Sequence, residues 1–333
     1  MPPPAGLPNR SVSAVRKPVD VIFIAGTGRS GSTILDRLLG QSPDVVSVGE
    51  FRSFWSRFPG GRPCSCGEPL QSCPFWSAVV RRAFGSVEKL PAAAVWRTHV
   101  WFRRLYFPFL ILPIKLPAFL RGFGDAQFRL LAAVREESGA GFIVDSSKTA
   151  ARGALLASLP GVRLHTIHIV RDSRAVAFSW RRPTVRGRPM GTRSLARSAF
   201  HWLRGNVAPF LLRFRSSEYV RVRYEDLVAQ PGRFVESYLR RLNLAPADLG
   251  PGPEFELATG HLAGGNPIRF EAGPVRIAED DEWKEKMSRR DVLALTLLTW
   301  PLLLKFGYPL LPAQRRAAPV RESEAPSDQP ASR

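Results

Sequence analysis

Residues 24–35, IAGTGRSGSTIL, have the residue types and the spacing of a loop that binds a phosphate group. Gly26 and Gly31 stand at the G-x-x-x-x-G spacing of a nucleotide-triphosphate P-loop, and Thr33 fills its Ser/Thr position. Ser32, however, replaces the lysine that kinases and ATPases place on the β- and γ-phosphates, and the loop's only cation is Arg29. An arginine fork suits a group with several equatorial oxygens that is contacted without a metal, and a transferring sulfuryl group is such an anion.

The loop lies between a predicted strand and a predicted helix, which is the context that a phosphate-binding loop requires. VDVIFIAG (19–26) is an apolar run that ends in glycine, and apolar side chains recur on one helical face over 32–40. Glycines let backbone N–H groups converge on an anion there, and the helix N-terminus adds positive potential. The alternative is a plain Gly/Ser turn between strand and helix.

The rest of the chain alternates between strands and helices. Apolar runs predict three further strands, at 141–145, 162–170 and 218–224. Helices are predicted between them, at 148–159 and 174–182. This alternation predicts an α/β fold with a P-loop-type parallel sheet flanked by helices, and with a helical insertion at about 50–137 after the first βα unit.

We predict one domain over 19–311 with tails at both ends. The polar, Pro-rich residues 1–18 and the Pro-, Ala- and Ser-rich residues 312–333 predict disordered segments. The first residues have no apolar core of a signal peptide, so we expect a cytoplasmic protein.

Two strongly apolar stretches are shorter than a membrane span. We predict a buried helix at 292–304, whereas 101–121 stays open between a core helix and peripheral membrane contact.

The charge of the chain predicts anionic partners. Among 333 residues, 48 Lys and Arg outnumber 28 Asp and Glu, for a net charge of +20. Nucleotides, sulfated or phosphorylated substrates and membrane surfaces all fit this charge. We expect no nucleic acid, because no strand carries interleaved aromatic residues. The basic run 181–193 is predicted either to cover an acidic or sugar acceptor or to be a solvated loop.

The cysteines form one short cluster, Cys64, Cys66 and Cys73. Structural zinc needs four ligands, and no histidine lies near these thiols in the sequence, since His99 is the next one along the chain. A disulfide or three ordinary small residues is therefore favoured over a metal site.

Five segments together resemble a known family. GTGRSGSTIL (26–35) resembles the 5′-phosphosulfate loop of the sulfotransferases that use 3′-phosphoadenylyl sulfate (PAPS), especially the carbohydrate and tyrosylprotein branches. The family's second hallmark is a strand that runs into an arginine, with a serine eight residues on, as Arg171 and Ser179 stand in IHIVRDSRAVAFSW. VRYEDLV (222–228) and GGNPIRF (264–270) resemble two further family segments. Residues 64–76 resemble a sequence found in bacterial members.

The resemblance, which covers about 19–311, implies roles for individual residues. Arg29 would neutralise charge on the bridging oxygen and the sulfonate as they separate, and Arg171 and Ser179 would select the 3′-phosphate. PAPS would be the co-substrate, without a metal. The complete predicted nucleotide site comprises Arg29, Ser30, Gly31, Ser32, Thr33, Arg171, Ser179, Tyr224, Asn266 and Arg269.

The resemblance also implies a catalytic base and a second cation. Glu50 follows the apolar run VVSV, which would lift it to the carboxyl edge of the sheet, and Lys148 would stabilise the sulfuryl group. Other family members use a histidine base, so His261, before the glycine loop, is the reserve candidate. His165 and His168 lie in a strand and are predicted to be sheet or core residues.

These observations predict a sulfotransferase that moves the sulfuryl group of PAPS to an acceptor hydroxyl by direct in-line transfer. The acceptor would be a small molecule, a carbohydrate or a lipid-linked sugar, or another alcohol or phenol. A P-loop kinase and a nonenzymatic basic protein for membranes or anions are the alternatives. The first would need the missing lysine and Mg²⁺, and the second leaves the paired phosphate motifs unexplained.

Overall fold

The structure, a computed structural model, describes residues 18–182, 193–247 and 254–311 together with 184–185, 188–189, 249–250 and 252. The two segments predicted to be disordered, 1–18 and 312–333, lie outside the described residues apart from Pro18. Residues 183, 186–187 and 190–192 of the basic run 181–193 lie outside them as well.

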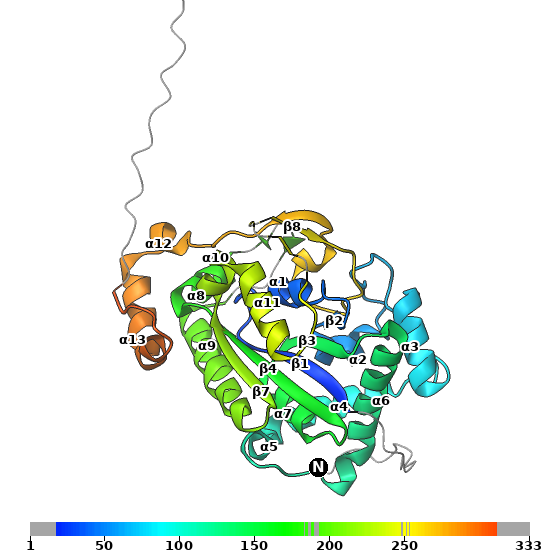
Figure 1. The fold of residues 1–333 in the computed structure, drawn as a ribbon. Helices are drawn as coiled ribbons and strands as arrows, with labels where there is room; N and C mark the ends of the chain where they lie inside the picture. The colour runs from blue at the N-terminus through cyan, green and yellow to red at the C-terminus, as the bar shows by residue number, and fades with distance from the viewer. Residues whose placement is uncertain are drawn as a thin grey trace, which may run out of the picture.

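Five parallel strands form the main sheet, in agreement with the predicted α/β fold (Figure 1). Across the sheet the order is β2 (Val45–Gly49), β3 (Phe142–Lys148), β1 (Val19–Gly26), β4 (Val162–Val170) and β7 (Glu218–Arg223). The central strand β1 is almost wholly buried, which explains its continuous apolar sequence: a parallel strand covered on both faces has no solvent side to be polar.

Alternate side chains of β1 point to opposite faces of the sheet, and different helices cover the two faces. Ile22 and Ile24 pack with α1 (Ser32–Leu39) and α11 (Pro231–Arg241). Val21 and Phe23 pack with α6 (Arg121–Ser138) and α7 (Ala150–Ser158) on the other side. Figure 1 shows α1 and α11 on one side of the sheet and α7 on the other.

The predicted insertion after the first βα unit is helical, as expected. After the short 3-10 turn Phe51–Ser53 it contains α2 (Phe54–Arg57), α3 (Pro74–Phe84), α4 (Ala92–Leu105), α5 (Phe107–Ile111) and α6. Phe54, Trp55 and Trp76 are almost completely buried among these helices. Because such large rings bury the most apolar area per side chain, they anchor the insertion to the sheet.

The C-terminal half completes the second face and then crosses over the carboxyl edge of the sheet. Its elements are α8 (Ser173–Arg181), β5 (Thr184–Val185), β6 (Arg188–Pro189), α9 (Leu195–Phe210), α10 (Tyr224–Ala229), β8 (Glu254–Leu257), β9 (Gly273–Arg276), α12 (Trp283–Lys286) and α13 (Arg289–Lys305). The antiparallel hairpin of β8 and β9 holds the segment 258–272 between its strands. This segment and the residues after β9 cover the edge where the functional residues gather.

The two apolar stretches differ from expectation in one respect. The buried helix predicted at 292–304 is buried on one side only: Leu295 and Leu303 are inaccessible, whereas Leu297 is 75% exposed. An apolar run predicts a helix but does not say how many neighbours cover it. For the segment 101–121 the sequence left two interpretations, a core helix and a peripheral membrane contact. In the structure Leu105, Phe107 and other large apolar side chains of this segment are exposed. In the part of the chain that the structure describes, no helix has both the length and the hydropathy to cross a membrane.

Candidate active site

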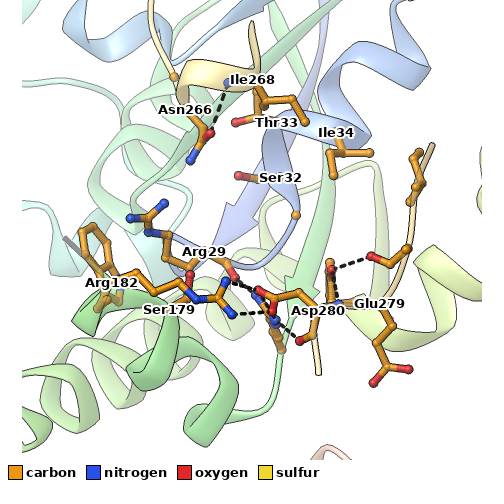
Figure 2. Close-up of a pocket in the computed structure, with 18 of the residues that line it drawn as sticks. Arg29, Ser32, Thr33, Ile34, Ser179, Arg182, Asn266, Ile268, Glu279 and Asp280 are labelled. Carbon is orange, nitrogen blue, oxygen red and sulfur yellow. Dashed lines mark hydrogen bonds and ion pairs between the residues drawn. The ribbon is translucent and has the colours of Figure 1, made fainter. Parts of the chain in front are cut away.

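A cleft of about 820 Å³ lies at the carboxyl edge of the main sheet. It collects residues that end or follow each of the five strands: Arg29 after β1, Glu50 after β2, Lys148 at the end of β3, Arg171 after β4 and Tyr224 after β7. This convergence follows from the topology, since parallel strands bring their carboxyl ends to one edge. The cover is formed by residues 265–268 and 275–282 (Figure 2).

The loop after β1 has the conformation of an anion cradle. Arg29 and Gly31 have φ values of 72° and 80°, so the backbone twice enters the left-handed region. Gly31 also leaves no room for a side chain, because a Cβ there would lie 2.7 Å from the Tyr224 ring. α1 begins directly after it at Ser32, and the first N–H groups of a helix have no intrahelical partners. Ser32 and Thr33 add hydroxyl groups to the same wall of the cleft.

Two nitrogen atoms of the Arg29 guanidinium group, Nε and Nη2, are buried without a hydrogen-bond partner among the described residues. The group lies over the Trp180 ring at 4.8 Å. Burial lowers the pKa of Arg29, and the nearby charges of Arg182 and Arg171 lower it further, against the opposite charge of Asp280. A half-buried cation that lies among other cations and has unbonded buried nitrogen atoms is matched to an anion that enters the cleft.

Arg171 and Ser179 both line the cleft, as their spacing predicted. Arg171 lies across the Tyr224 ring at 4.3 Å and donates to the backbone oxygens of Arg29 and Asp280, over 2.9 and 2.5 Å. It also forms a 3.1 Å ion pair with the carboxylate of Asp280. Arg171 is therefore held at the loop, with a carboxylate as its present anionic partner.

Sequence reasoning missed Asp280 and Arg182. Asp280 accepts two hydrogen bonds from Arg182, over 3.0 and 2.8 Å, in addition to its pairing with Arg171. Burial would raise the pKa of Asp280, but the two arginines outweigh it and hold this pKa below its usual value. The available signal was the run AEDDE (278–282), which is an acidic cluster in a strongly basic chain.

Glu50 and Lys148 meet in the same cleft as Arg29. Lys148 Nζ donates to Glu50 Oε1 over 2.6 Å and to the backbone oxygen of Ser146 over 3.1 Å. The Glu50 backbone N–H donates to the oxygen of Gly264, so the covering segment fixes its position. Burial would raise the pKa of Glu50, but Lys148 and then Arg52 outweigh it and hold this pKa below its usual value.

The other predicted nucleotide-site residues divide into two groups. Tyr224 and Asn266 line the cleft. Ser30 and Arg269 do not: the Ser30 hydroxyl is buried against Thr27, at 2.9 Å, and Arg269 donates to the backbone oxygen of Gly265 over 2.7 Å. These two side chains brace the loop and the covering segment from behind.

Comparisons with known proteins agree with this geometry. No family model matches the chain. Carbohydrate sulfotransferase 7 of Rattus norvegicus is 25% identical over 397 residues, which cover 96% of this chain and 81% of the rat protein. The protein of the same name from Mus musculus is 32% identical over 130 residues, 38% of this chain and 26% of the mouse protein.

Two solved structures share the fold. The sulfotransferase domain from the curacin biosynthetic pathway has a TM-score of 0.52 at 19% identity, over 89% of this chain and 100% of that domain. The sulfotransferase domain of the Synechococcus PCC 7002 olefin synthase has a TM-score of 0.51 at 20% identity, over 91% and 100%. In sequence the chain is thus similar to a carbohydrate sulfotransferase, and in fold it is similar to sulfotransferase domains.

Asp145 is not among the residues that line the cleft. It ends the apolar run 141–145, and a P-loop kinase would need an aspartate after a strand to hold Mg²⁺. It is fully buried, and Arg152 Nε donates to its Oδ2 over 2.7 Å. Asp145 therefore holds α7 to β3, and the donor set of the cleft does not favour the kinase alternative.

Three of the histidines lie away from the cleft, whereas His201 lines the second cavity described below. His165 and His168 are buried in β4, as predicted, and bond to Asp20 and to Tyr219 and Asn206. His261, the reserve base, is not among the residues that line the cleft, because its Nδ1 faces the cysteine cluster.

A second cavity of about 270 Å³ adjoins the cleft. Both cavities are lined by Gly28, Glu50, Lys148 and Trp180. The remaining lining is strongly basic and includes Arg52, Arg103, Arg193 and Arg204. Glu50 is the only acidic residue among the described residues that line it. Burial lowers the pKa of Arg103, and the charges of Arg52 and Arg204 add to this effect.

Proposed function

We propose that this protein is a sulfotransferase that takes the sulfuryl group from PAPS and transfers it directly to an acceptor hydroxyl. The observation that carries the proposal is Arg29, whose guanidinium has two buried nitrogen atoms without a hydrogen-bond partner among the described residues and lies in a loop that is shaped for a phosphate group. A sulfuryl group next to the 5′-phosphate would give these nitrogen atoms an anionic partner. The guanidinium fork could then contact two oxygens at once.

The cleft has donors for two separate phosphate groups. Gly31, Ser32 and Thr33 offer backbone N–H groups and hydroxyls at the start of α1, which suits the 5′-phosphate. Arg171 and Ser179 offer a cation and a hydroxyl, which suits the 3′-phosphate. Since Asp280 now pairs with Arg171, the incoming phosphate would replace one anion by another at the same cation.

The residues between the two cavities can perform an in-line transfer. Glu50 accepts the proton of the acceptor hydroxyl as that oxygen forms its bond to sulfur. The bond from sulfur to the bridging phosphate oxygen breaks in the same step, and negative charge grows on that oxygen. Arg29 and Lys148 stabilise this charge, which makes their contribution larger in the transition state than in the ground state.

The ion pair between Glu50 and Lys148 requires an exchange of partners before this step. With Lys148 at 2.6 Å, Glu50 has a lowered pKa and is a weak base. A bound sulfuryl group would compete for Lys148 and draw its charge away. Glu50 would then keep its burial but lose its nearest cation, and its pKa would rise towards that of a useful base.

The second cavity is suited to an acceptor with a negative charge close to its reactive hydroxyl. Its wall contains several arginines and only Glu50 as a counter-charge. A neutral acceptor that filled this cavity would leave these arginines without an anionic partner, which costs free energy. A sugar acid, a phosphorylated sugar or a sugar linked to a lipid phosphate fits this requirement.

Part of the wall of the second cavity belongs to the segment 101–121, which has exposed apolar side chains. Arg103 and Tyr106 line the second cavity, while Leu105 and Phe107, their neighbours in the sequence, are 48% and 56% exposed. Apolar side chains beside arginines are the pattern of a surface that binds an anionic membrane. A lipid-linked acceptor could thus reach the second cavity from a membrane on which this segment rests.

Thermal-shift measurements with 3′,5′-adenosine bisphosphate (PAP), AMP and ATP–Mg²⁺ test the nucleotide part of the proposal. PAP should stabilise the native protein far more than AMP does, because only PAP supplies the 3′-phosphate. Arg171→Ala should remove most of this preference, since a lost charge-assisted pair costs roughly 1.5–3 kcal/mol, about 10- to 100-fold in affinity.

Arg181→Ala is the matched control, because Arg181 lies in α8 but is 51% exposed, pairs with Asp291 and does not line the cleft. It should retain the native preference for PAP. Equal affinity of the native protein for PAP and AMP would overturn the PAPS assignment, and selective stabilisation by ATP–Mg²⁺ would favour the kinase. Acceptors are then found by offering PAPS with acidic sugars, phosphorylated sugars, glycolipids and phenols, and neutral sugars for comparison.

A further inference from the structure

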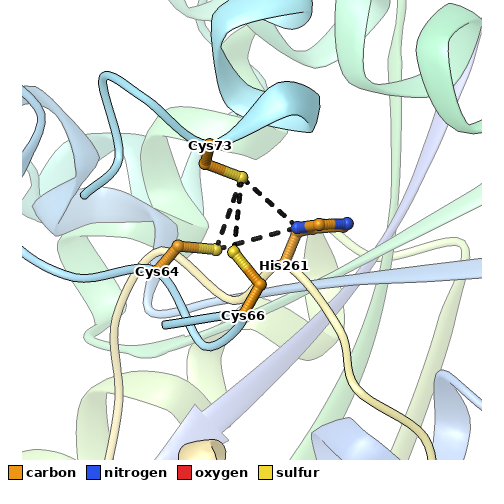
Figure 3. A group of neighbouring side chains, drawn as sticks. All are labelled: Cys64, Cys66, Cys73 and His261. Carbon is orange, nitrogen blue, oxygen red and sulfur yellow. Dashed lines mark hydrogen bonds between the residues drawn. The ribbon is translucent and has the colours of Figure 1, made fainter. Parts of the chain in front are cut away.

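The three cysteines meet His261 in one cluster outside the cleft (Figure 3). Cys64 and Cys66 lie on the loop before α3, Cys73 is the residue that precedes this helix, and His261 comes from the covering segment. Their three Sγ atoms and one imidazole nitrogen all lie within 4.8 Å of one another. The expectation that no histidine is near these thiols is therefore wrong.

The spacing of the four atoms matches a tetrahedron around one ion. The Sγ of Cys73 lies 3.7 Å from that of Cys64 and 3.7 Å from that of Cys66. His261 Nδ1 lies 3.3 Å from Cys73 Sγ and 3.9 Å from Cys64 Sγ. Tetrahedral zinc with bonds of about 2.3 Å to sulfur and about 2.0 Å to nitrogen has S···S edges of roughly 3.8 Å and S···N edges of roughly 3.5 Å.

A disulfide does not explain the cluster. All three cysteines are free thiols, and the 3.7 Å separations far exceed an S–S bond of about 2.05 Å. Three cysteines also leave one thiol over after any pairing, whereas a four-ligand site uses all three and the histidine.

The backbone around the ligands is held as a built site would require. Ser65, between two of the cysteines, donates from its hydroxyl to the oxygen of Gly260 and accepts from the N–H of Leu262, over 2.6 and 2.7 Å. These bonds fix the residues on both sides of His261. Trp76 Nε1 donates to the oxygen of His261 itself over 2.7 Å, and Phe75 stacks on its ring at 5.1 Å.

The chemistry of the four side chains suits an added cation. Three thiols and one imidazole within 4.8 Å of one another are all possible metal ligands. A divalent cation among them would deprotonate the thiols on coordination and balance the charge of the thiolates that form.

We propose that Cys64, Cys66, Cys73 and His261 bind one zinc ion as a structural site. Soft thiolates with one imidazole select zinc over hard cations. Since protein ligands fill all four tetrahedral positions, no position is left for water or substrate, and the site is closed rather than catalytic.

The zinc would fasten the cover of the active site to the insertion. His261 is three residues before Gly264, whose oxygen accepts the N–H of Glu50, and five before Asn266, which lines the cleft. The Arg57 guanidinium bonds the oxygen of Ala263 over 2.7 Å, so the segment already has protein anchors. Loss of zinc should therefore loosen the cleft as well as the cluster; this consequence alone rests on the proposed function.

Metal analysis of the full-length protein, purified without chelator, tests the proposal directly. We expect about one zinc per chain. Cys66→Ser and His261→Asn should each lose most of it on dialysis, while Ser72→Ala should keep it. Ser72 is the matched control because it is exposed and lies next to Cys73 on the same loop. The readout does not involve nucleotide or activity, so it is independent of the sulfotransferase assignment.

The native protein provides a second test if these variants fail to fold. Removal of metal with a strong zinc chelator should lower the melting temperature and expose the three thiols to a thiol reagent, and added Zn²⁺ should reverse both effects. Co²⁺ added to the metal-free protein should give the absorption of a tetrahedral thiolate site. Native protein that stays free of zinc after incubation with Zn²⁺, or that contains a disulfide or iron with sulfide in this cluster, would overturn the proposal.

Discussion

Replacement of Glu50 by Gln is the most informative change in the active site. The substitution keeps the shape of the side chain, but it removes the proton acceptor and the 2.6 Å ion pair with Lys148. Turnover should fall on the order of 10²–10⁴-fold, the usual contribution of a general base. PAP should still bind as in the native protein, because its predicted contacts lie on the loop and on Arg171.

The fall in turnover that comes from loss of the base can be distinguished from the fall that comes from loss of the ion pair with Lys148. The side chains of Glu50 and Lys148 are only 22% and 13% exposed, so a lost charged hydrogen bond between them costs roughly 1.5–3 kcal/mol, about 10- to 100-fold. If Glu50 only positioned Lys148, Glu50→Gln would have little further effect in a Lys148→Gln background. If Glu50 is the base, the double variant should lose activity well beyond Lys148→Gln alone.

The assay is initial-rate sulfation of the best acceptor found with PAPS, measured across pH. In the free enzyme the pKa of Glu50 is below its usual 4.5, so kcat/KM should decline as the pH falls through that lowered value, whereas kcat should decline at a higher pH because the bound sulfuryl group draws Lys148 away; the Glu50→Gln variant should lack both declines. The free energy of unfolding should change in the same direction. Because the pKa of Glu50 is lower in the folded than in the unfolded protein, its ionised form stabilises the folded state above the unfolded pKa, and this stabilisation is lost as the pH falls through the folded pKa. Glu88→Gln, an exposed control that lines neither cavity, should leave the rate profile unchanged. Near-native turnover of Glu50→Gln would refute the base assignment.

Three further predictions follow from the same geometry. Arg29→Ala should lower turnover far more than PAP affinity, as single-turnover rates and thermal shifts can compare; an equal loss in both would show that Arg29 only binds. Asp280→Asn should raise PAP affinity by about 10-fold, because it removes the anion that competes for Arg171, and calorimetry showing weaker binding would contradict this. Burial raises the pKa of Asp36 to about 7, against hydrogen bonds from Ser146 and Ser47, so the folded state binds this proton more tightly than the unfolded state does. Stability should therefore decline as the pH rises from about 4 to about 7. In melting curves the Asp36→Asn variant should show a smaller decline, and an unchanged slope would contradict the assignment.

The strands and the loop were predictable because their signals are local. A buried parallel strand such as β1 must be apolar throughout, and the loop after it needs glycines where the backbone becomes left-handed. The position of Glu50 was predictable for the same reason, since it stands directly after a short apolar run and the ends of such runs share one edge, whereas Lys148 was implied by the family resemblance. Their placement in one cleft confirms this geometric expectation.

What was missed depends on contacts between distant segments. Cys73 and His261 are 188 positions apart, and only the path of the covering segment brings them together. Asp280 likewise reaches Arg171 only through the path of the residues after β9, so neither residue type nor spacing predicts the pair. The burial of 292–304 was overestimated because an apolar run carries no information on what packs against it. Ser30 was assigned to the cleft by its place in the motif, but the turn of the backbone directs its hydroxyl to Thr27.

The wall that the two cavities share, made by Gly28, Glu50, Lys148 and Trp180, has a consequence for kinetics. PAPS in the cleft and the acceptor in the second cavity would lie on opposite sides of this wall. Both would therefore be bound when the sulfuryl group passes from one to the other. Double-reciprocal plots at several acceptor concentrations should then intersect rather than run parallel, and no sulfated enzyme should accumulate when PAPS is supplied alone. PAP should compete with PAPS but not with the acceptor. A chiral sulfuryl group should reach its acceptor with inverted configuration, since a single displacement turns the sulfur once.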